Sequence, residues 1–251
     1  MDEQRRAPAL MPGERLDDLQ CGGYGLIQRG DAFRFGTDSV LLADFAAPRP
    51  RTRAVDLGCG TGAIATLMAA HEPSLLVDAV ELQADVADMA RRSVAYNGLE
   101  ARMRVFTADM RQAHALLGHG QYALAVCNPP YGRDGAALVS AREGMRRARH
   151  ECGLTPGDVA ASAARLLQNG GRLCVIFPAP RALEMMRAME DHRIAPKRVR
   201  TVHGMPGRAP RFVLLDGVKG GGSGLMWLPP LVLREQDGSF SAEWRRIYRV
   251  E

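Results

Sequence analysis

Residues 54–62, AVDLGCGTG, set the architecture of this chain. The apolar run 54–57 indicates a buried strand, glycines follow at positions 58, 60 and 62, and residues 62–70 place apolar side chains at helical spacing. A strand that turns through glycines into a helix leaves backbone N–H groups open to a ligand at the helix N-terminus. Glycine also allows close approach, because it has no β-carbon. The stretch therefore predicts the first strand, turn and helix of a ligand-binding α/β sheet.

Strand and helix patterns alternate along the rest of the chain. Predicted strands cover 75–80, 103–107, 122–127 and 172–177, and predicted helices cover 84–96 and 182–191. A further helix is predicted to open at Thr155, its N-cap, and to end at Asn169-Gly170-Gly171. The runs 198–202 and 212–215 are expected to pair antiparallel. This alternation is typical of a mostly parallel sheet with helices on both faces.

The first 50 residues differ from the remainder. Glycines between short apolar runs over 19–35 predict a hairpin, and 37–47 predicts a helix. We therefore expect residues 1–50 to form an N-terminal extension packed on the core, and residues 51–251 to form one globular unit. Composition agrees, since 251 residues with 46% hydrophobic content suffice for one full α/β domain.

Bulk properties exclude several classes of protein. The five cysteines are scattered without a CxxC pair, which predicts reduced, structural cysteines in a cytoplasmic protein and no metal site. No apolar stretch is long enough to span a bilayer, and the N-terminus is polar, so we expect neither a membrane partner nor a signal peptide. The net charge of +5 is compatible with a nucleic-acid partner but does not establish one.

Three carboxylates fall at the ends of successive predicted strands. Asp56 precedes the glycine turn, Glu81 ends the second strand and Asp109 ends the third. Ligands of open α/β sheets bind at these strand ends. Glu81 can accept both hydroxyl protons of a ribose and disfavours a phosphate there, and Asp109 can accept from an adenine amino group. The pattern indicates a nucleoside cofactor, although Asp56 and Asp109 could instead cap a turn and a helix, and Glu81 could be an ordinary surface charge.

The sequence Asn128-Pro129-Pro130-Tyr131 follows the fourth predicted strand. An exocyclic amine is a poor nucleophile, because its lone pair is delocalised into the ring. The Asn128 side-chain oxygen and the Pro129 carbonyl can accept hydrogen bonds from both N–H groups, and Tyr131 can stack on the base. With the glycine turn, this motif predicts methyl transfer from S-adenosylmethionine to a nitrogen. The alternative is a strand-terminating proline turn with an aromatic plug.

The combination resembles class I S-adenosylmethionine-dependent amino-methyltransferases of the NPPY type. More closely, residues 34–43, RFGTDSVLLA, resemble the N-terminal signature of the bacterial tRNA1(Val) adenine-37 N6-methyltransferase family, as do 202–203, 211–215, 219–221 and 229–231. The resemblance covers about residues 16 to 248. It implies a Rossmann-like, seven-stranded, mostly parallel sheet with an antiparallel last strand. One departure is Gly132, where many relatives place a bulky aromatic.

The resemblance also implies roles for individual residues. Asp56, Gly58 and Gly60 are expected to line the methionine moiety of the cofactor, Glu81 its ribose and Asp109 its adenine. Asn128 and Pro129 are expected to hold the target amine, with Tyr131 stacked on the base and Asn128 also bordering the cofactor. Thr37 and Asp38 match positions near the methionine end, with helix capping as the alternative.

A basic segment follows the catalytic motif closely. Its cations are Arg142, Arg146, Arg147, Arg149 and His150. A helix there would present them beside the pocket, so we predict contacts with tRNA phosphates; the alternative is a solvated basic helix. A weaker candidate patch contains Arg193, Lys197, Arg198 and Arg200.

The leading functional hypothesis is methylation of adenine N6 in tRNA, next to the anticodon at position 37, on a base turned out of its stack. Other readings stay open. A glutamine amide also presents an NH2 group, so an N5-glutamine methyltransferase of release factors is the nearest rival. An rRNA guanine-N2 or DNA adenine methyltransferase, and a non-catalytic cofactor-binding or RNA-binding module, are further alternatives. The sequence does not reveal the oligomeric state.

Overall fold

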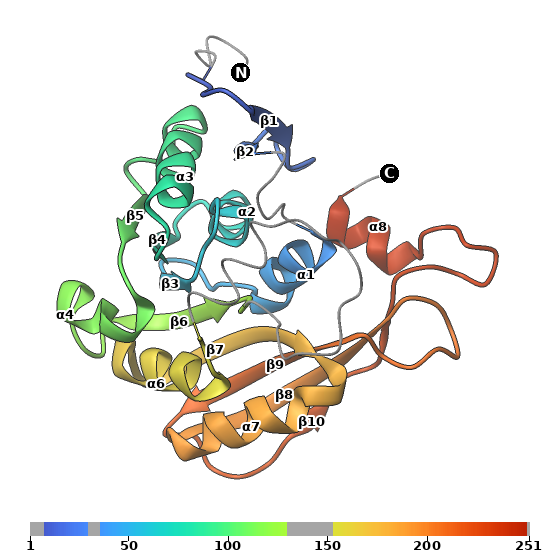
Figure 1. Ribbon diagram of the computed structural model, residues 1–251. Helices are drawn as coiled ribbons and strands as arrows, with labels where there is room; N and C mark the ends of the chain where they lie inside the picture. The colour runs from blue at the N-terminus through green and yellow to red at the C-terminus, as the bar shows by residue number, and fades with distance from the viewer. Residues whose placement is uncertain (1–7, 30–35, 130–152, 250–251) are drawn as a thin grey trace.

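A twisted central sheet organises the chain in the computed structural model, which describes residues 8–29, 36–129 and 153–249 (Figure 1). The strand order is β10-β8-β9-β7-β6-β3-β4-β5, and β11 also pairs with β8. The strands are β3 (Arg53–Leu57), β4 (Leu76–Glu81), β5 (Met103–Thr107), β6 (Tyr122–Cys127), β7 (Leu167–Pro178), β8 (Ile194–His203), β9 (Phe212–Lys219), β10 (Met226–Trp227) and β11 (Leu231–Val232).

The strand directions confirm the predicted mostly parallel sheet. Strands β3 to β7 run parallel to one another. Strand β9 is antiparallel to both of its neighbours, β7 and β8. The sheet has nine strands rather than the expected seven, because β10 and β11 add two short parallel pairings to β8. Each contains only two residues, which is too short for a periodic pattern to reveal.

Two predicted boundaries are wrong. The sequence predicts the hairpin over 19–35, but its first strand covers Glu14–Asp18 and so begins earlier. Helix α6 (Pro156–Leu166) ends before Asn169-Gly170-Gly171, and these residues lie inside β7 instead. The pairing of β6 with β7 shifts register between Tyr122 and Leu124, opposite this stretch. Gly170 has φ of 76°, and a β-carbon on Gly171 would lie 2.9 Å from the Gln168 carbonyl oxygen. The glycines therefore serve a strand irregularity and not a helix end.

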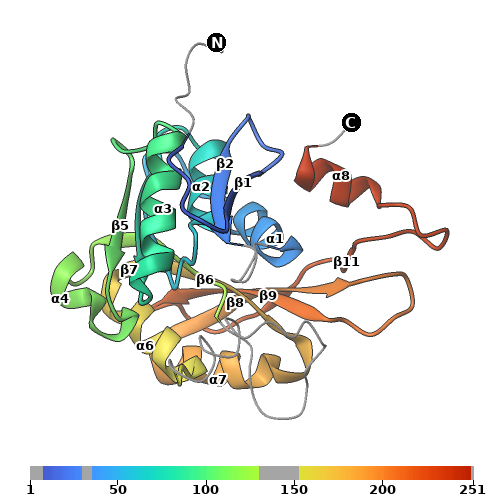
Figure 2. The ribbon, with the colours of Figure 1, turned by 45° about the horizontal axis from the view of Figure 1, so that its top comes forward.

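Helices cover both faces of the sheet (Figure 2). One face carries α1 (Thr37–Ala46), α2 (Ala63–His71) and α3 (Ala84–Tyr96), and the other carries α4 (Ala113–Leu117), α6 and α7 (Ala182–Asp191). Strand β6 alternates between them: Leu124 and Val126 enter the core with α1 and α2, whereas Ala125 and Cys127 enter the core with α6 and α7. This period of two is what a strand buried on both sides requires.

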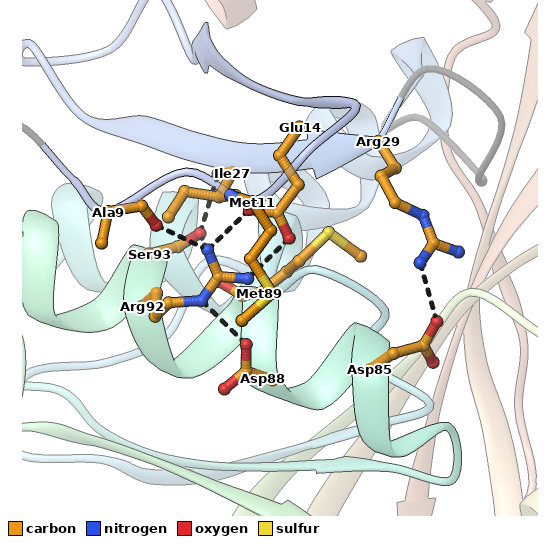
Figure 3. A network of polar contacts seen from close by, with 10 residues as sticks. All are labelled: Ala9, Met11, Glu14, Ile27, Arg29, Asp85, Asp88, Met89, Arg92 and Ser93. Carbon is orange, nitrogen blue, oxygen red and sulfur yellow. Dashed lines mark hydrogen bonds and ion pairs between the residues drawn. The ribbon is translucent and has the colours of Figure 1, made fainter.

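The N-terminal hairpin, β1 (Glu14–Asp18) and β2 (Gly25–Arg29), is antiparallel and docks on α3 (Figure 3). Arg92 donates to both Glu14 carboxylate oxygens at 2.6 Å, and the Ile27 N–H donates to the Ser93 hydroxyl at 2.9 Å. Asn97 exchanges two hydrogen bonds with the Gly25 backbone. These bonds fix the hairpin against the helix that follows β4.

The C-terminal tail folds back over α1, where Figure 1 shows α8 (Ala242–Tyr248). Ile247 is buried in the core that α1 and α2 share. The Ser241 hydroxyl accepts from the Trp244 N–H at 3.0 Å and so caps the helix. Arg200 and Arg246 tie the tail to the body through ion pairs with Glu243 and Asp44. The tail thereby lies against the helix that opens at Thr37.

Candidate active site

The turn after β3 is built by glycines in the left-handed region. Gly58, Gly60 and Gly62 have φ of 73°, 57° and 88°, which L side chains rarely adopt. The N–H groups of Gly58 and Cys59 both donate to the Val80 carbonyl, so the turn is anchored to β4. A β-carbon built on Gly60 would meet no heavy atom within 4 Å. The turn therefore presents open space on this side, as a ligand cradle requires.

Glu81 lies at the end of β4 and joins this strand to the glycine turn. Its carboxylate accepts from the Gly60 and Gln83 N–H groups, each at 2.9 Å. Burial raises the pKa of Glu81 above its ordinary value, and the backbone hydrogen bonds oppose this. The residue is 9% exposed, so it is largely but not completely buried. This position suits a carboxylate that accepts from ribose hydroxyls.

Asp56 is completely buried beneath the turn. Within the described part of the chain, neither carboxylate oxygen has a hydrogen-bond partner of good geometry. Burial raises the pKa of Asp56 to about 7; the Ala65 backbone N–H, which is near but not well aligned, opposes the rise, and the Glu81 charge adds to it. A buried, uncompensated carboxylate favours a cation nearby. A role for Asp56 towards the cofactor stays a prediction, because the structure shows only that its carboxylate is buried near the turn.

Asp109 follows β5, as predicted, but its carboxylate is engaged locally. It accepts from the Arg111 N–H at 2.9 Å and forms an ion pair with the Arg111 guanidinium at 2.5 Å. Arg111 holds the pKa of Asp109 below its ordinary value. The capping alternative is thus present in the structure, at the start of the short helix η1 (Met110–Gln112). The contact with adenine stays a prediction.

The structure joins two motifs that lie 90 residues apart. The Asn128 amide nitrogen, just after β6, donates to the Asp38 carboxylate of α1 at 3.0 Å. Because the amide NH2 group faces Asp38, its oxygen lies on the other side of the amide carbon and is oriented as an acceptor. A β-carbon on Gly36 would lie 2.7 Å from an Asp38 carboxylate oxygen, which explains the glycine. Sequence reasoning assigned Asp38 to the cofactor and missed this contact.

Thr37 opens α1 beside Asp38. The N-cap of α1 is Gly36, which makes no side-chain cap hydrogen bond, but Asp38 in the first turn accepts from the Ser39 N–H at 3.0 Å. The alternative of stabilising the helix start therefore holds in part for Asp38 and not for Thr37. The Thr37 side chain lies close to the Tyr248 phenol of α8. Burial raises the pKa of the Tyr248 phenol, and the Thr37 side chain opposes the rise. Nothing in the sequence near either residue predicts this proximity.

Other predicted residues fall into two groups. Pro130, Tyr131 and the segment with Arg142, Arg146, Arg147 and Arg149 lie outside the described residues, whereas Pro129 directly follows Asn128. In the weaker basic patch, Arg198 pairs with Asp216, Arg200 pairs with Glu243, and Lys197 donates to backbone carbonyls of 222–224. These three cations are therefore already engaged within the chain.

Across the described residues, no cluster of three or more His, Cys, Asp or Glu side chains could hold a metal ion. Cys21, Cys59, Cys127 and Cys174 are free and buried. Over the same residues, no helix has both the length and the apolarity needed to cross a bilayer.

Comparison with known proteins identifies the class. Residues 32–200 match the family described as the methyltransferase small domain. Fold, glycine turn and this match together define a class I methyltransferase, whose methyl donor is S-adenosylmethionine. The chain is 31% identical over 224 residues to the tRNA1(Val) (adenine(37)-N6)-methyltransferase of Dickeya chrysanthemi (strain Ech1591), with 87% of each sequence covered. The chain belongs to the tRNA1(Val) (adenine(37)-N6)-methyltransferase family.

Solved structures agree on the fold. A predicted O-methyltransferase from Agrobacterium tumefaciens aligns with a TM-score of 0.71 at 24% identity, covering 85% of this chain and 96% of that one. The Thermus thermophilus 16S rRNA N2 G1207 methyltransferase, solved with AdoMet and guanosine, aligns with a TM-score of 0.60 at 18% identity. The alignment covers 87% of this chain and 54% of that one. The predicted family and the predicted fold are confirmed.

Proposed function

We propose that this protein transfers a methyl group from S-adenosylmethionine to the exocyclic N6 of adenine 37 in tRNA. The observation that carries the proposal is the hydrogen bond between Asn128 and Asp38, which orients an amide oxygen at the carboxyl end of β6. The family membership supports the choice of an adenine in tRNA. We further propose that the protein acts on RNA in the cytoplasm.

The residues around the turn would hold the cofactor. Glu81 would accept from its ribose hydroxyls, the backbone of Gly58 and Gly60 would border its methionine part, and buried Asp56 would favour its positive charge. When bound, S-adenosylmethionine supplies an electrophilic methyl group on a sulfonium. Asp56 and Glu81 would thus supply the negative charge that a cationic cofactor favours, without a further charged residue.

The catalytic residues would act as hydrogen-bond acceptors for the target amine. The Asn128 oxygen and the Pro129 carbonyl would accept from the two N–H groups of adenine N6, which favours a pyramidal nitrogen with an available lone pair. Asn128 is neutral and takes no proton; its contribution would be to hold and polarise the amine, and the proton that the methylated nitrogen loses would pass to solvent. Proline at 129 has no N–H that would compete. Asp38 positions Asn128 and does not touch the substrate in this scheme.

An adenine within structured RNA must leave its stack to reach these acceptors. We propose that Tyr131 then stacks on the extruded base, a contact worth roughly 1–3 kcal/mol. The basic segment with Arg142, Arg146, Arg147 and Arg149 is proposed to contact tRNA phosphates nearby.

A labelling experiment tests the function. The protein is incubated in parallel with radiolabelled S-adenosylmethionine and total tRNA, rRNA or release factor. We expect label in tRNA, and N6-methyladenosine after nucleoside digestion. Label only in the release factor would mean that the acceptors hold a glutamine amide, and label only in rRNA would point to a different nucleobase; either result refutes the proposal.

A further inference from the structure

A second pocket has Thr37 in its lining and contains no residue of the glycine turn. Its volume is about 520 Å³, and it lies between the β8–β9 connection, the tail and the start of α1. Its size falls within the range of small-ligand sites. The lining contains three arginines and no acidic residue: Thr37, Gly204, Met205, Arg208, Ala209, Arg211, Leu233, Arg234, Phe240 and Trp244.

The three arginines are exposed and lack carboxylate partners within the described residues. Arg211 lies 5.7 Å from the Phe212 ring centroid, and Arg234 lies 4.1 Å from that of Phe240 while donating to the Gly238 carbonyl. By contrast, Arg200 and Arg246 in the same region are ion-paired. The pocket therefore concentrates positive charge that the chain itself does not neutralise, which attracts a polyanion.

The walls of this pocket are held rigidly. The rings of Phe240 and Trp244 stack at 3.7 Å, and those of Trp244 and Tyr248 stack at 4.0 Å. Tyr248 in turn lies next to Thr37 at the start of α1, where α8 and α1 are in contact. On the other side, the His203 ring bonds the Arg208 carbonyl at 2.6 Å. Because these contacts hold the segments that carry the arginines, less conformational entropy of the protein is lost when a ligand binds.

The pocket is linked to the proposed catalytic amide through the start of α1. Thr37 lines the pocket, and the next residue, Asp38, accepts from the Asn128 amide at 3.0 Å. Figure 1 shows α8 beside α1, and the two helices are in contact. The pocket lining is therefore one residue away from the side chain that holds Asn128.

We propose that this pocket binds the sugar–phosphate backbone of the nucleotides that flank the target adenine. The inference rests on the proposed function and adds a substrate subsite to it. Arginine forks bind phosphate oxygens bidentately, and such contacts position a nucleic acid without reading its sequence. Arg208 and Arg211 are the phosphate ligands. The guanidinium plane of Arg234, already stacked on Phe240, offers its outer side to a ribose or base.

The test compares two double variants of the full chain. Arg208→Gln/Arg211→Gln removes the subsite charges. Arg49→Gln/Arg187→Gln removes the same charge elsewhere: both residues are exposed, and neither has an ion pair in the described structure. Arg49 lies in the loop between α1 and β3, and Arg187 lies on α7, on the sheet face opposite α1. Thermal melting of both variants verifies the fold. The measurements are KM for tRNA, the salt dependence of tRNA affinity, and cofactor affinity.

For the subsite variant, the slope of log affinity against log salt should become shallower by about 2, one for each phosphate that the protein no longer neutralises. KM for tRNA should rise at least about tenfold, with unchanged cofactor affinity. The control variant should keep the wild-type slope and KM. Equal behaviour of the two variants would overturn the inference. If the wild-type protein methylates no tRNA, the proposed function itself fails, which separates the two outcomes.

Discussion

Replacement of Asp38 offers the sharpest test of how the catalytic amide is oriented. Asp38 accepts from the Asn128 amide at 3.0 Å in a partly buried setting. A hydrogen bond to a charged group contributes about 1.5–3 kcal/mol. If that energy holds Asn128 in its productive orientation, Asp38→Ala should lower kcat by about 10- to 150-fold, since each 1.36 kcal/mol corresponds to a factor of ten. Asp38→Asn keeps an acceptor oxygen of the same shape and should lose less than about tenfold.

The assay measures kcat at saturating cofactor and tRNA together with the dissociation constant of S-adenosylmethionine. We expect Asp38→Ala to lower kcat with little change in cofactor affinity, and we expect kcat to recover partly in Asp38→Asn. If Asp38 instead bound the ammonium of the cofactor, the dissociation constant would rise by a similar factor while kcat at saturation would hold. An unchanged kcat in Asp38→Ala would refute the positioning role.

Two further predictions concern stability. The folded pKa of Asp56, about 7, lies above its ordinary value of 3.8, so the native state binds this proton more tightly and its stability falls as pH rises through that window. In cofactor-free protein, the stability of Asp56→Asn relative to wild type should therefore increase by about 4 kcal/mol between pH 4 and pH 8, measured by denaturant unfolding; a difference independent of pH would contradict this. Arg92→Ala leaves the Glu14 side chain, 4% exposed, without its ion pair, and should lower the free energy of unfolding by about 2 kcal/mol, between the values for exposed and buried pairs. The matched control Arg246→Ala, whose side chain is 59% exposed, should lose less than about 1 kcal/mol, and equal losses would count against the hairpin anchor.

The sheet could be predicted because its strands are short apolar runs bounded by glycines and charges. Helix α7 begins and ends where its periodicity does, at Ala182 and Asp191, and β5 and β6 match their apolar runs. The glycine turn is equally local, because three positive φ values within five residues leave few residue types possible. In each case the signal and the structure it determines occupy the same stretch of chain.

The rest could not be predicted, because the determining contacts join distant residues. Nothing near Asp38 shows that it meets Asn128, 90 positions later, and nothing near Thr37 shows that it meets Tyr248. Asn169-Gly170-Gly171 is a plausible helix end by local rules, and only the register of β6 against β7 reveals it as part of a strand. The pocket arginines likewise come from two distant segments, Arg208 and Arg211 from the β8–β9 connection and Arg234 from the tail, so no single run of basic residues marks the pocket.

In the proposed mechanism, the Asn128 side-chain oxygen accepts a hydrogen bond from the amine that receives the methyl group. The most direct measurement is methylation of tRNA by Asn128→Ala, with S-adenosylmethionine binding followed in the same preparation. The account predicts a loss of turnover of roughly 100-fold or more, as for removal of a main transition-state hydrogen bond, with cofactor binding nearly intact. Turnover close to that of the wild type would contradict it.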